Sequence, residues 1–255
     1  MLNRLKASLS QPKSLFTYKD DRKRIVFLYT LIILLLAMIP YVIIEVTQGT
    51  FDTQMTVALK EAFQADVMQK EIEIVNGQLL SEEYFDTIVD VNVFTNDPGL
   101  NTFYVVIFFS DTHFQIKLGN EVIEEVSYMD VLPNFDFKDN SLENTSLLIT
   151  TLRTFINDST FVSMLMLGSV FFSLTLDYLM VTFLLVLLMQ LNPQANSLPF
   201  KTKYKLGLYM STPYIVSSLI LILFGLGSLT FISLFVGYAY YIWAYRLSGG
   251  NRAQV

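Results

Sequence analysis

The sequence contains no cysteine and a single histidine, His113. Without cysteine, a disulfide framework, a thiolate nucleophile and a cysteine metal site are all excluded. A single histidine excludes a multi-histidine metal site. The motifs of a nucleophile elbow, a zinc protease and a glycine-rich phosphate loop are also missing from the chain. The sequence therefore argues against an enzyme, and we expect neither a catalytic residue nor a cofactor.

Charged residues are scarce as well, at 16% of the 255 residues, against about 25% in an average soluble domain. Hydrophobic residues make up 53% of the chain and gather in long uncharged blocks. A helix needs about 20 apolar residues to cross a bilayer. The blocks predict an integral membrane helical bundle of four transmembrane helices, at residues 25–44, 161–191, 206–224 and 229–245.

The first block, residues 25–44, contains no charge, and Pro40 near its end is expected to kink the helix. This run is too long for the apolar part of a signal peptide, and no small-residue cleavage site follows it. An uncleaved signal anchor is therefore favoured.

The remaining blocks carry their own boundary signals. The string "NDST" at residues 157–160 is typical of a helix N-terminus and precedes the second block. Pro213, in the string "STP", is expected to kink the third helix, and a gate there would require two conformations. The string "GLGS" at residues 225–228 predicts a tight turn before the fourth block, which ends in tyrosines and Trp243 typical of an interfacial belt.

Positive charge lies on one side of this plan. Residues 1–24 hold seven Lys/Arg, the loop 192–205 holds three, and the tail 246–255 holds two. Residues 45–160 hold five Lys/Arg against twenty acids. Lys and Arg collect in short cytoplasmic flanks. We therefore expect a multi-pass plasma-membrane protein with both termini in the cytoplasm and residues 45–160 outside.

The N-terminal segment, residues 1–24, places Leu2, Leu5 and Leu9 at helical spacing beside basic residues. This pattern suits a short helix that lies on the inner leaflet, separated by Pro12 from the rest of the segment. Contact with anionic lipid is the favoured interpretation. Docking of a cytoplasmic partner is the alternative.

Residues 45–160 are long enough for one domain with its own core. A helical period at residues 51–67 is followed by alternation at 70–80, where Asn76-Gly77 is a strong hairpin-turn signal. A helix is expected at residues 141–158. Further alternating segments predict strands at residues 86–95, 101–111, 112–119 and 121–129. The sequence thus predicts an extracytoplasmic α+β domain with an antiparallel sheet, inserted between the first and second spans.

The acids of this domain form no EF-hand string. Asp136 and Asp139 lie in a turn-like stretch and are a weak calcium candidate, but a solvated acidic surface is favoured, so no metal site is assigned. The aromatic residues could stack on sugar rings or form the core, and their alternating positions favour the core; they are Tyr84, Phe85, Tyr104, Phe114, Tyr128, Phe135 and Phe137.

One carboxylate, Asp177, lies inside the second block, where it costs roughly 2.5–3.5 kcal/mol on insertion scales. Ser169, Ser173 and Asp177 recur at every fourth position and share one helix face, and Gly168 nearby would allow close helix approach. Counting along helices at 1.5 Å per residue places three hydroxyl residues at a similar depth in the third and fourth spans: Tyr214, Ser218 and Ser233.

This polar stripe has two interpretations. It could be a proton or cation relay, or it could be interhelical glue that fixes packing or pairs with a partner helix. Carriers usually assemble several ionisable groups along a path, whereas the spans offer one. The glue interpretation is therefore favoured, and the protonation state of Asp177 stays open.

Three features together resemble a known family: the string "IEIVNGQL" at residues 72–79, the string "YKLGLYMSTPYIVSSLILILFGL" at residues 204–226, and the four-span plan with a basic N-terminus. The chain resembles the MalA-type proteins of maltodextrin-utilisation clusters, a Gram-positive membrane family of unknown function. The span layout is also similar, more weakly, to Yip1-type membrane proteins. The MalA-type resemblance implies an accessory role in carbohydrate uptake and supplies no catalytic residues.

The function expected from the sequence is therefore that of a non-enzymatic accessory or sensor protein in the lipid bilayer, with a permease or transporter subunit as its partner. The alternative is a small transporter or channel-like homo-oligomer that uses Asp177 as an intramembrane proton or cation site. Nothing in the sequence indicates a nucleic-acid partner.

Overall fold

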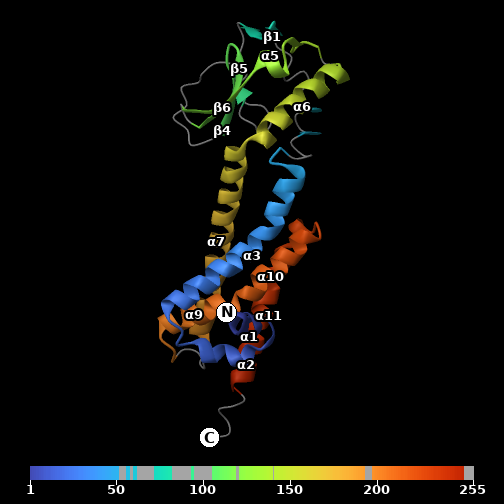
Figure 1. Ribbon diagram of the computed structural model, residues 1–255. Helices are drawn as coiled ribbons and strands as arrows, with labels where there is room; N and C mark the ends of the chain where they lie inside the picture. The colour runs from blue at the N-terminus through green and yellow to red at the C-terminus, as the bar shows by residue number, and fades with distance from the viewer. Residues whose placement is uncertain are drawn as a thin grey trace. The chain divides into compact units, whose positions relative to one another are not determined.

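The computed structural model describes residues 1–51, 56–57, 60–61, 72–81, 93–94, 105–118, 121–139, 141–192 and 197–249 (Figure 1). The chain divides into two compact units. Residues 1–43 and 167–255 form the membrane unit, and residues 44–166 form the inserted unit. Several expectations lie outside the described residues, namely most of the 51–67 helix, most of the 86–95 strand, Tyr84, Phe85, Tyr104 and Arg252.

Three described helical segments are long and apolar enough to cross a membrane: α3 (Lys23–Gln48), α7 (Thr160–Leu191) and the stretch Phe200–Leu223. The last consists of α9 (Phe200–Met210) and α10 (Thr212–Leu223). α3 begins in the membrane unit, and its last turn belongs to the inserted unit. α7 begins in the inserted unit, and the rest of the helix belongs to the membrane unit. These helices confirm a largely helical chain with three candidate membrane-spanning segments.

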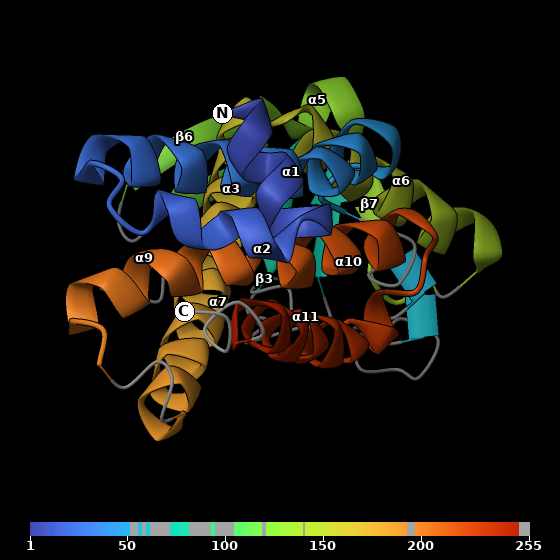
Figure 2. The same cartoon turned by 90° about the horizontal axis from the view of Figure 1, so that it is seen from below.

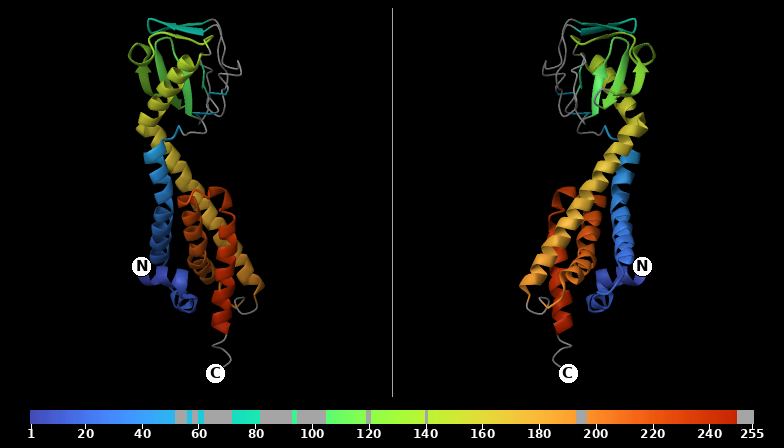
Figure 3. Two further views of the ribbon diagram at one scale, coloured as in Figure 1. Left: turned by 90° about the vertical axis from the view of Figure 1, so that its right-hand side faces the viewer. Right: turned by 90° about the vertical axis from the view of Figure 1, so that its left-hand side faces the viewer.

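The expected fourth span corresponds to α11 (Ile232–Gly249), which follows the short 3₁₀ turn η2 (Gly227–Leu229). It does not join the three apolar segments, because its second half is rich in tyrosine and contains Arg246. α11 runs beside α10 (Figure 3). At Gly237 a β-carbon would lie 3.3 Å from Cβ of Tyr214. Its membrane crossing remains a prediction.

The two prolines behave differently. α3 continues through Pro40. The third segment is interrupted at Ser211, between the end of α9 and the start of α10, and Pro213 lies in the first turn of α10. The Ser211 hydroxyl donates to carbonyl oxygens one turn back, at 3.0 Å to Gly207 and 3.1 Å to Leu208. The helix is thus interrupted at "STP", where a kink was expected, and the Ser211 hydroxyl bonds back to the last turn of α9.

One boundary was wrong. Residues 200–205 were expected in a loop, but α9 begins at Phe200. Three lysines in this stretch suggested a solvated connection. α9 begins before the apolar block, and in this added stretch Lys203 is buried at 5% exposure, so the stretch is not a fully solvated connection.

The N-terminal segment is helical, as expected, with α1 (Leu2–Ser10), α2 (Pro12–Leu15) and the 3₁₀ turn η1 (Phe16–Tyr18). α1 and α2 pack against the bundle of α9, α10 and α11 (Figure 2). Ala7 and Leu15 are completely buried there, whereas Leu2 is 81% exposed. Lipid contact alone therefore does not describe this segment, because one of its faces belongs to the core of the membrane unit.

The inserted unit contains two sheets. β1 (Ile72–Val75), β2 (Gln78–Ser81) and β7 (Phe135–Asp136) form the first, in the order β2-β1-β7. The hairpin expected at Asn76-Gly77 is confirmed, with φ of 49° and 72° at the two turn residues, as a type I′ turn requires. The second has the order β3-β4-β5-β6 and consists of β3 (Val93–Phe94), β4 (Val105–Phe109), β5 (His113–Leu118) and β6 (Glu121–Ser127).

A fully antiparallel sheet was expected, and this was wrong in one place, because β3 pairs parallel with β4. The β4-β5 and β5-β6 pairs are antiparallel. Alternation within a strand reports which faces it presents, but it carries no information on the direction of its neighbour.

Two helices complete the inserted unit, α5 (Tyr128–Val131) and α6 (Leu142–Asp158). The expected 141–158 helix is confirmed, and Ser141 caps it by accepting a hydrogen bond from Asn144 N at 3.2 Å. α6 packs on the core with Leu148 and Leu152. Four of the aromatic residues considered for sugar stacking are buried in this core: Phe114, Tyr128, Phe135 and Phe137. For these four the core interpretation is confirmed.

The two ends of the inserted unit are joined by polar bonds. The Glu45 carboxylate accepts from Thr50 Oγ1 at 2.5 Å and from Ser163 Oγ at 2.7 Å. Phe51 N donates to Asn157 Oδ1 at 2.7 Å. These bonds connect the last turn of α3 with the end of α6 and the start of α7, so the entry and exit of the inserted unit lie together. We call this set of residues the neck.

Candidate functional site

Asp177 lies on an exposed face of α7, and no described residue donates a hydrogen bond to it. Two phenols, Tyr41 of α3 and Tyr214 of α10, lie within electrostatic reach of its carboxylate. Large apolar side chains surround it on the same exposed side of α7, including Leu176 and Met180. The carboxylate therefore faces outward from the membrane unit, among apolar groups.

The rest of the predicted stripe is divided between two places. Ser169 and Ser173 are exposed on α7, whereas Ser218 and Ser233 are buried, and the Ser233 hydroxyl has no hydrogen-bond partner among the described residues. Tyr214 lies one turn before Ser218 on α10. Of the hydroxyl residues estimated at the same depth, the structure thus brings Tyr214 near Asp177.

The expected close approach at Gly168 is absent. A β-carbon there would meet nothing within 4 Å. The tight helix contact lies instead at Gly207 of α9, where a β-carbon would lie 3.0 Å from Val186 Cγ2 and 3.2 Å from Thr182 O. Sequence reasoning selected the glycine beside the polar stripe, but the glycines that face another helix are Gly207 on α9 and Gly237 on α11.

A buried polar cluster surrounds the break between α9 and α10. The Thr182 and Ser211 hydroxyls are 2.9 Å apart, and the Tyr29 and Thr212 hydroxyls are 2.8 Å apart. These bonds connect α7 and α3 to the two residues at the break. All four side chains are at most 2% exposed. The string "STP" in the sequence indicated the break. Nothing in the sequence indicated that Tyr29 of α3 and Thr182 of α7 would form hydrogen bonds there.

A second polar cluster fixes the N-terminal segment. Arg4 forms a two-point ion pair with Asp21, at 2.6 Å from Nε and 2.8 Å from Nη2. Tyr209 of α9 donates to the same carboxylate at 2.6 Å, and Lys205 donates to the Asp21 carbonyl. Tyr240 of α11 donates to the Ala7 carbonyl. We call this set of contacts the N-terminal lock. Sequence reasoning missed it, because Arg4 is 17 positions from Asp21 in the chain and Tyr209 is 188 positions from it.

The lock predicts a pH dependence with a definite sign. The hydrogen bond from Arg4 is the main cause that holds the pKa of Asp21 below its ordinary value of 3.8; partial burial opposes it, and the bond from Tyr209 adds to it. A depressed carboxyl pKa stabilises the docked segment above the ordinary pKa, and this contribution is lost as the pH falls through the depressed value. Docking should therefore be constant between about pH 5 and 8 and weaken below about pH 4.

Asp21→Asn should release the segment at neutral pH, since hydrogen bonds to a charged group contribute about 1.5–3 kcal/mol. Trypsin cleavage at Lys13 and Lys19 in the purified full chain would measure the release. Asp20→Asn is the matched control, because Asp20 is exposed and next in sequence. Equal cleavage of the two variants would contradict the role of Asp21.

Asp136 and Asp139, the weak calcium candidates, are engaged by the backbone. Asp136 Oδ1 accepts from Lys138 N at 2.8 Å, and Asp139 Oδ1 accepts from Ser141 N at 2.9 Å. Asn144 Nδ2 bonds to both main-chain carbonyls at 2.7 Å. These bonds shape the approach to α6. Within the described residues, no group of three or more His, Cys, Asp or Glu is placed to hold a metal ion.

The inserted unit also has a surface groove with a cavity volume of about 320 Å³. It lies between α6 and the β6-α5 segment. Threonine hydroxyls and the Asp158 carboxylate line it together with Val126, Val131 and Phe155. The groove is thus mostly apolar with a few polar groups, which is the composition usual for small-molecule sites.

Comparison of the chain with family models, with curated proteins and with solved structures gave no match.

Proposed function

We propose that this protein is a non-enzymatic accessory or sensor component of a membrane uptake system. In the proposed topology α11 is the fourth span, both termini are cytoplasmic and residues 45–160 lie outside. The Lys/Arg distribution supports this topology, since residues 1–24 and the 192–205 loop are basic while residues 45–160 carry twenty acids.

The observation that carries the proposal is the outward position of Asp177 on an apolar helix. A carboxyl group that faced lipid at this depth would be costly. Polar side chains in spans are tolerated where another helix supplies a partner. We infer that α7 pairs through its Asp177 face with a transmembrane helix of a permease or transporter subunit.

The carbohydrate assignment rests on the resemblance to MalA-type proteins. The groove on the inserted unit is the surface where a sugar would be sought, since its hydroxyls and the Phe155 ring offer polar and stacking contacts. The neck would connect such a ligand to α3 and α7, because Glu45 accepts a hydrogen bond from Ser163 and Asn157 accepts one from Phe51 N.

A transporter or channel-like oligomer is the alternative, and the observation in its favour is the pair of phenols near Asp177. A relay would use Tyr41 and Tyr214 as further polar stations beside the single carboxyl group. Proton or cation flux through the purified protein in liposomes, lost in Asp177→Asn, would support this alternative and displace the accessory proposal.

The accessory proposal predicts different results for two substitutions of Asp177. Asp177→Asn keeps a hydrogen-bonding side chain and should retain the partner, whereas Asp177→Leu should weaken association about tenfold, in line with the roughly 1–2 kcal/mol of an interhelical hydrogen bond. Gentle detergent extraction, pull-down and quantitative mass spectrometry would measure the transport subunit retained by each variant.

Met180→Leu is the control, because Met180 is exposed on the same helix and its replacement changes no polar group. Loss of the transport subunit from Met180→Leu as well as from Asp177→Leu would point to general disruption of α7. Retention of the subunit by all three variants would refute pairing through Asp177.

A further inference from the structure

A cavity of about 460 Å³ lies in the membrane unit between α3, α7 and α9. Its walls are mostly apolar, with Phe27 from α3, Leu179 from α7, and Phe200 and Leu208 from α9. The volume is within the range of small-molecule sites, about 300–1,000 Å³. Phe27 and Phe200 are 70% and 54% exposed, so the cavity opens at the surface of helices that are apolar enough to span a membrane.

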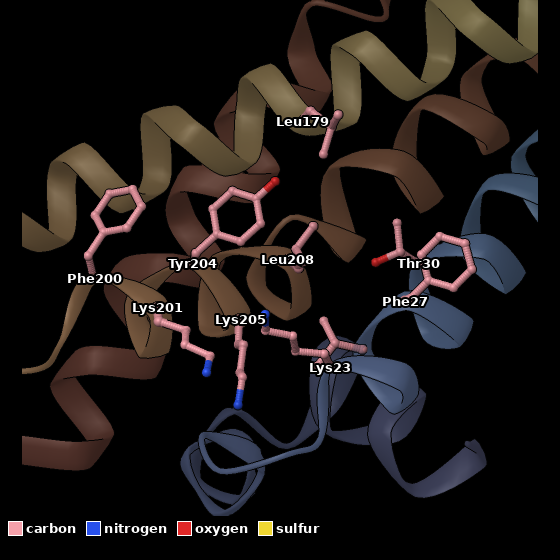
Figure 4. Close-up of a pocket in the computed structure, with 10 residues that line it drawn as sticks. Lys23, Phe27, Thr30, Leu179, Phe200, Lys201, Tyr204, Lys205 and Leu208 are labelled. Carbon is pink, nitrogen blue, oxygen red and sulfur yellow. The ribbon is translucent and has the colours of Figure 1, made fainter.

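Three lysines line this cavity, and they come from two helices. Lys201 and Lys205 are one turn apart on α9, and Lys23 is the first residue of α3. Lys201 and Lys205 extend in the same direction, and the side chain of Lys23 reaches from α3 toward α9 (Figure 4). Lys205 already donates to the Asp21 carbonyl. Lys23 and Lys201 form no ion pair with any residue in the described part of the chain.

The opposite wall adds a polar group. Thr30 lies one turn beyond Val26 on α3 and also lines the cavity (Figure 4). The Thr30 Oγ1 atom is buried and lies beside the Tyr178 hydroxyl of α7.

We propose that this cavity binds an anionic phospholipid, with its phosphate at Lys23 and Lys201 and an acyl chain against the apolar wall. Charge and shape together favour this ligand. Ammonium groups attract a phosphate, and basic pockets between transmembrane helices bind anionic headgroups. A small hydrophilic anion fits this cavity less well than a lipid, because it would leave the apolar wall without a contact.

Lys205 connects this lipid site with the N-terminal lock. Its side chain lines the cavity and also bonds to the residue that pairs with Arg4. A lipid phosphate at the cavity adds negative charge beside Lys205 and stabilises its ammonium group in place. Bound lipid should therefore hold the N-terminal segment more firmly, which the trypsin assay detects as slower cleavage at Lys13 and Lys19.

Native mass spectrometry of the full chain in detergent tests the proposal, with phosphatidylglycerol and phosphatidylcholine of identical acyl chains as probes. Wild-type protein should retain phosphatidylglycerol and release phosphatidylcholine. The double variant Lys23→Gln/Lys201→Gln should retain about thirtyfold less phosphatidylglycerol, given about 1 kcal/mol for each of the two basic residues near an anionic surface. The double variant Lys13→Gln/Lys19→Gln removes the same charge from exposed positions away from the cavity and should behave as wild type.

A second variant tests the apolar wall. Leu179→Trp fills the cavity from a position that is already 37% exposed and keeps all three lysines, so it should reduce lipid retention while folding normally. Equal loss of phosphatidylglycerol from the two lysine pairs would overturn the proposal, because binding would then follow net charge alone. Unchanged retention by Leu179→Trp would overturn the seated acyl chain. Protection from trypsin by inorganic phosphate alone, equal to that by phosphatidylglycerol, would assign the site to a free anion and overturn the lipid as its ligand.

Discussion

Gly49→Ala is expected to destabilise the inserted unit by about 2–4 kcal/mol. Gly49 follows the last residue of α3 and has φ of 79°, a conformation in which a β-carbon is strained. An added β-carbon would also lie 2.4 Å from the side chain of Asn157. Asn157 cannot simply move away, because its Oδ1 accepts the hydrogen bond from Phe51 N that closes the neck.

The chain supplies a control that separates strain from collision. Gly225 has φ of 71°, but a β-carbon there would meet nothing within 4 Å. Gly225→Ala should therefore cost only the backbone term, about 1 kcal/mol. Thermal denaturation in detergent would measure both variants, and hydrogen exchange of the β5 and β6 amides would locate the effect of Gly49→Ala in the inserted unit. Equal effects at the two glycines would show that the contact with Asn157 contributes nothing.

Gly207→Leu is expected to separate α9 from α7 and to destabilise the membrane unit by about 3 kcal/mol. The nearest atoms include the carbonyl oxygen of Thr182 at 3.2 Å, which belongs to the α7 backbone and cannot rotate away. Small residues at helix crossings let backbones approach in this manner. Separation of the helices would also break the Thr182–Ser211 bond beside the α9–α10 break.

Gly168→Leu is the matched control, since it adds the same side chain to another apolar helix where a β-carbon meets nothing within 4 Å. The midpoint of thermal unfolding in detergent should fall for Gly207→Leu and stay near that of wild type for Gly168→Leu. A cross-link between cysteines introduced on α7 and α9 would report the helix separation directly. If Gly168→Leu lowered the midpoint as much, the close crossing at Gly207 would not be the cause.

Several parts of the fold were predictable because their causes are local. The hairpin at Asn76-Gly77 follows from two residues that accept positive φ. The start of α7 follows from Ser159, whose hydroxyl accepts from Val162 N at 3.2 Å. The apolar blocks predicted α3 and α7 because an uncharged run of that length has few other stable places. In each case neighbours in sequence supply the interacting groups.

The fourth span shows where such reasoning weakens. α11 is a helix, as expected, but its tyrosines lower its hydropathy, and Tyr240 uses its hydroxyl to bond to Ala7. Composition treats that tyrosine as part of an interfacial belt. The contact that explains it lies 233 positions away in the chain.

The candidate site, like the fold, was predictable from the sequence only in part. The sequence by itself determined that Asp177 lies in an apolar helix and that Pro213 breaks another, since both follow from residue type and position. Only the tertiary structure decided that Asp177 faces outward near Tyr41 and Tyr214, that Arg4 pairs with Asp21, and that Lys23 and Lys201 border one cavity. These relations depend on how helices rotate and cross, and that is set by side-chain packing between segments far apart in the chain.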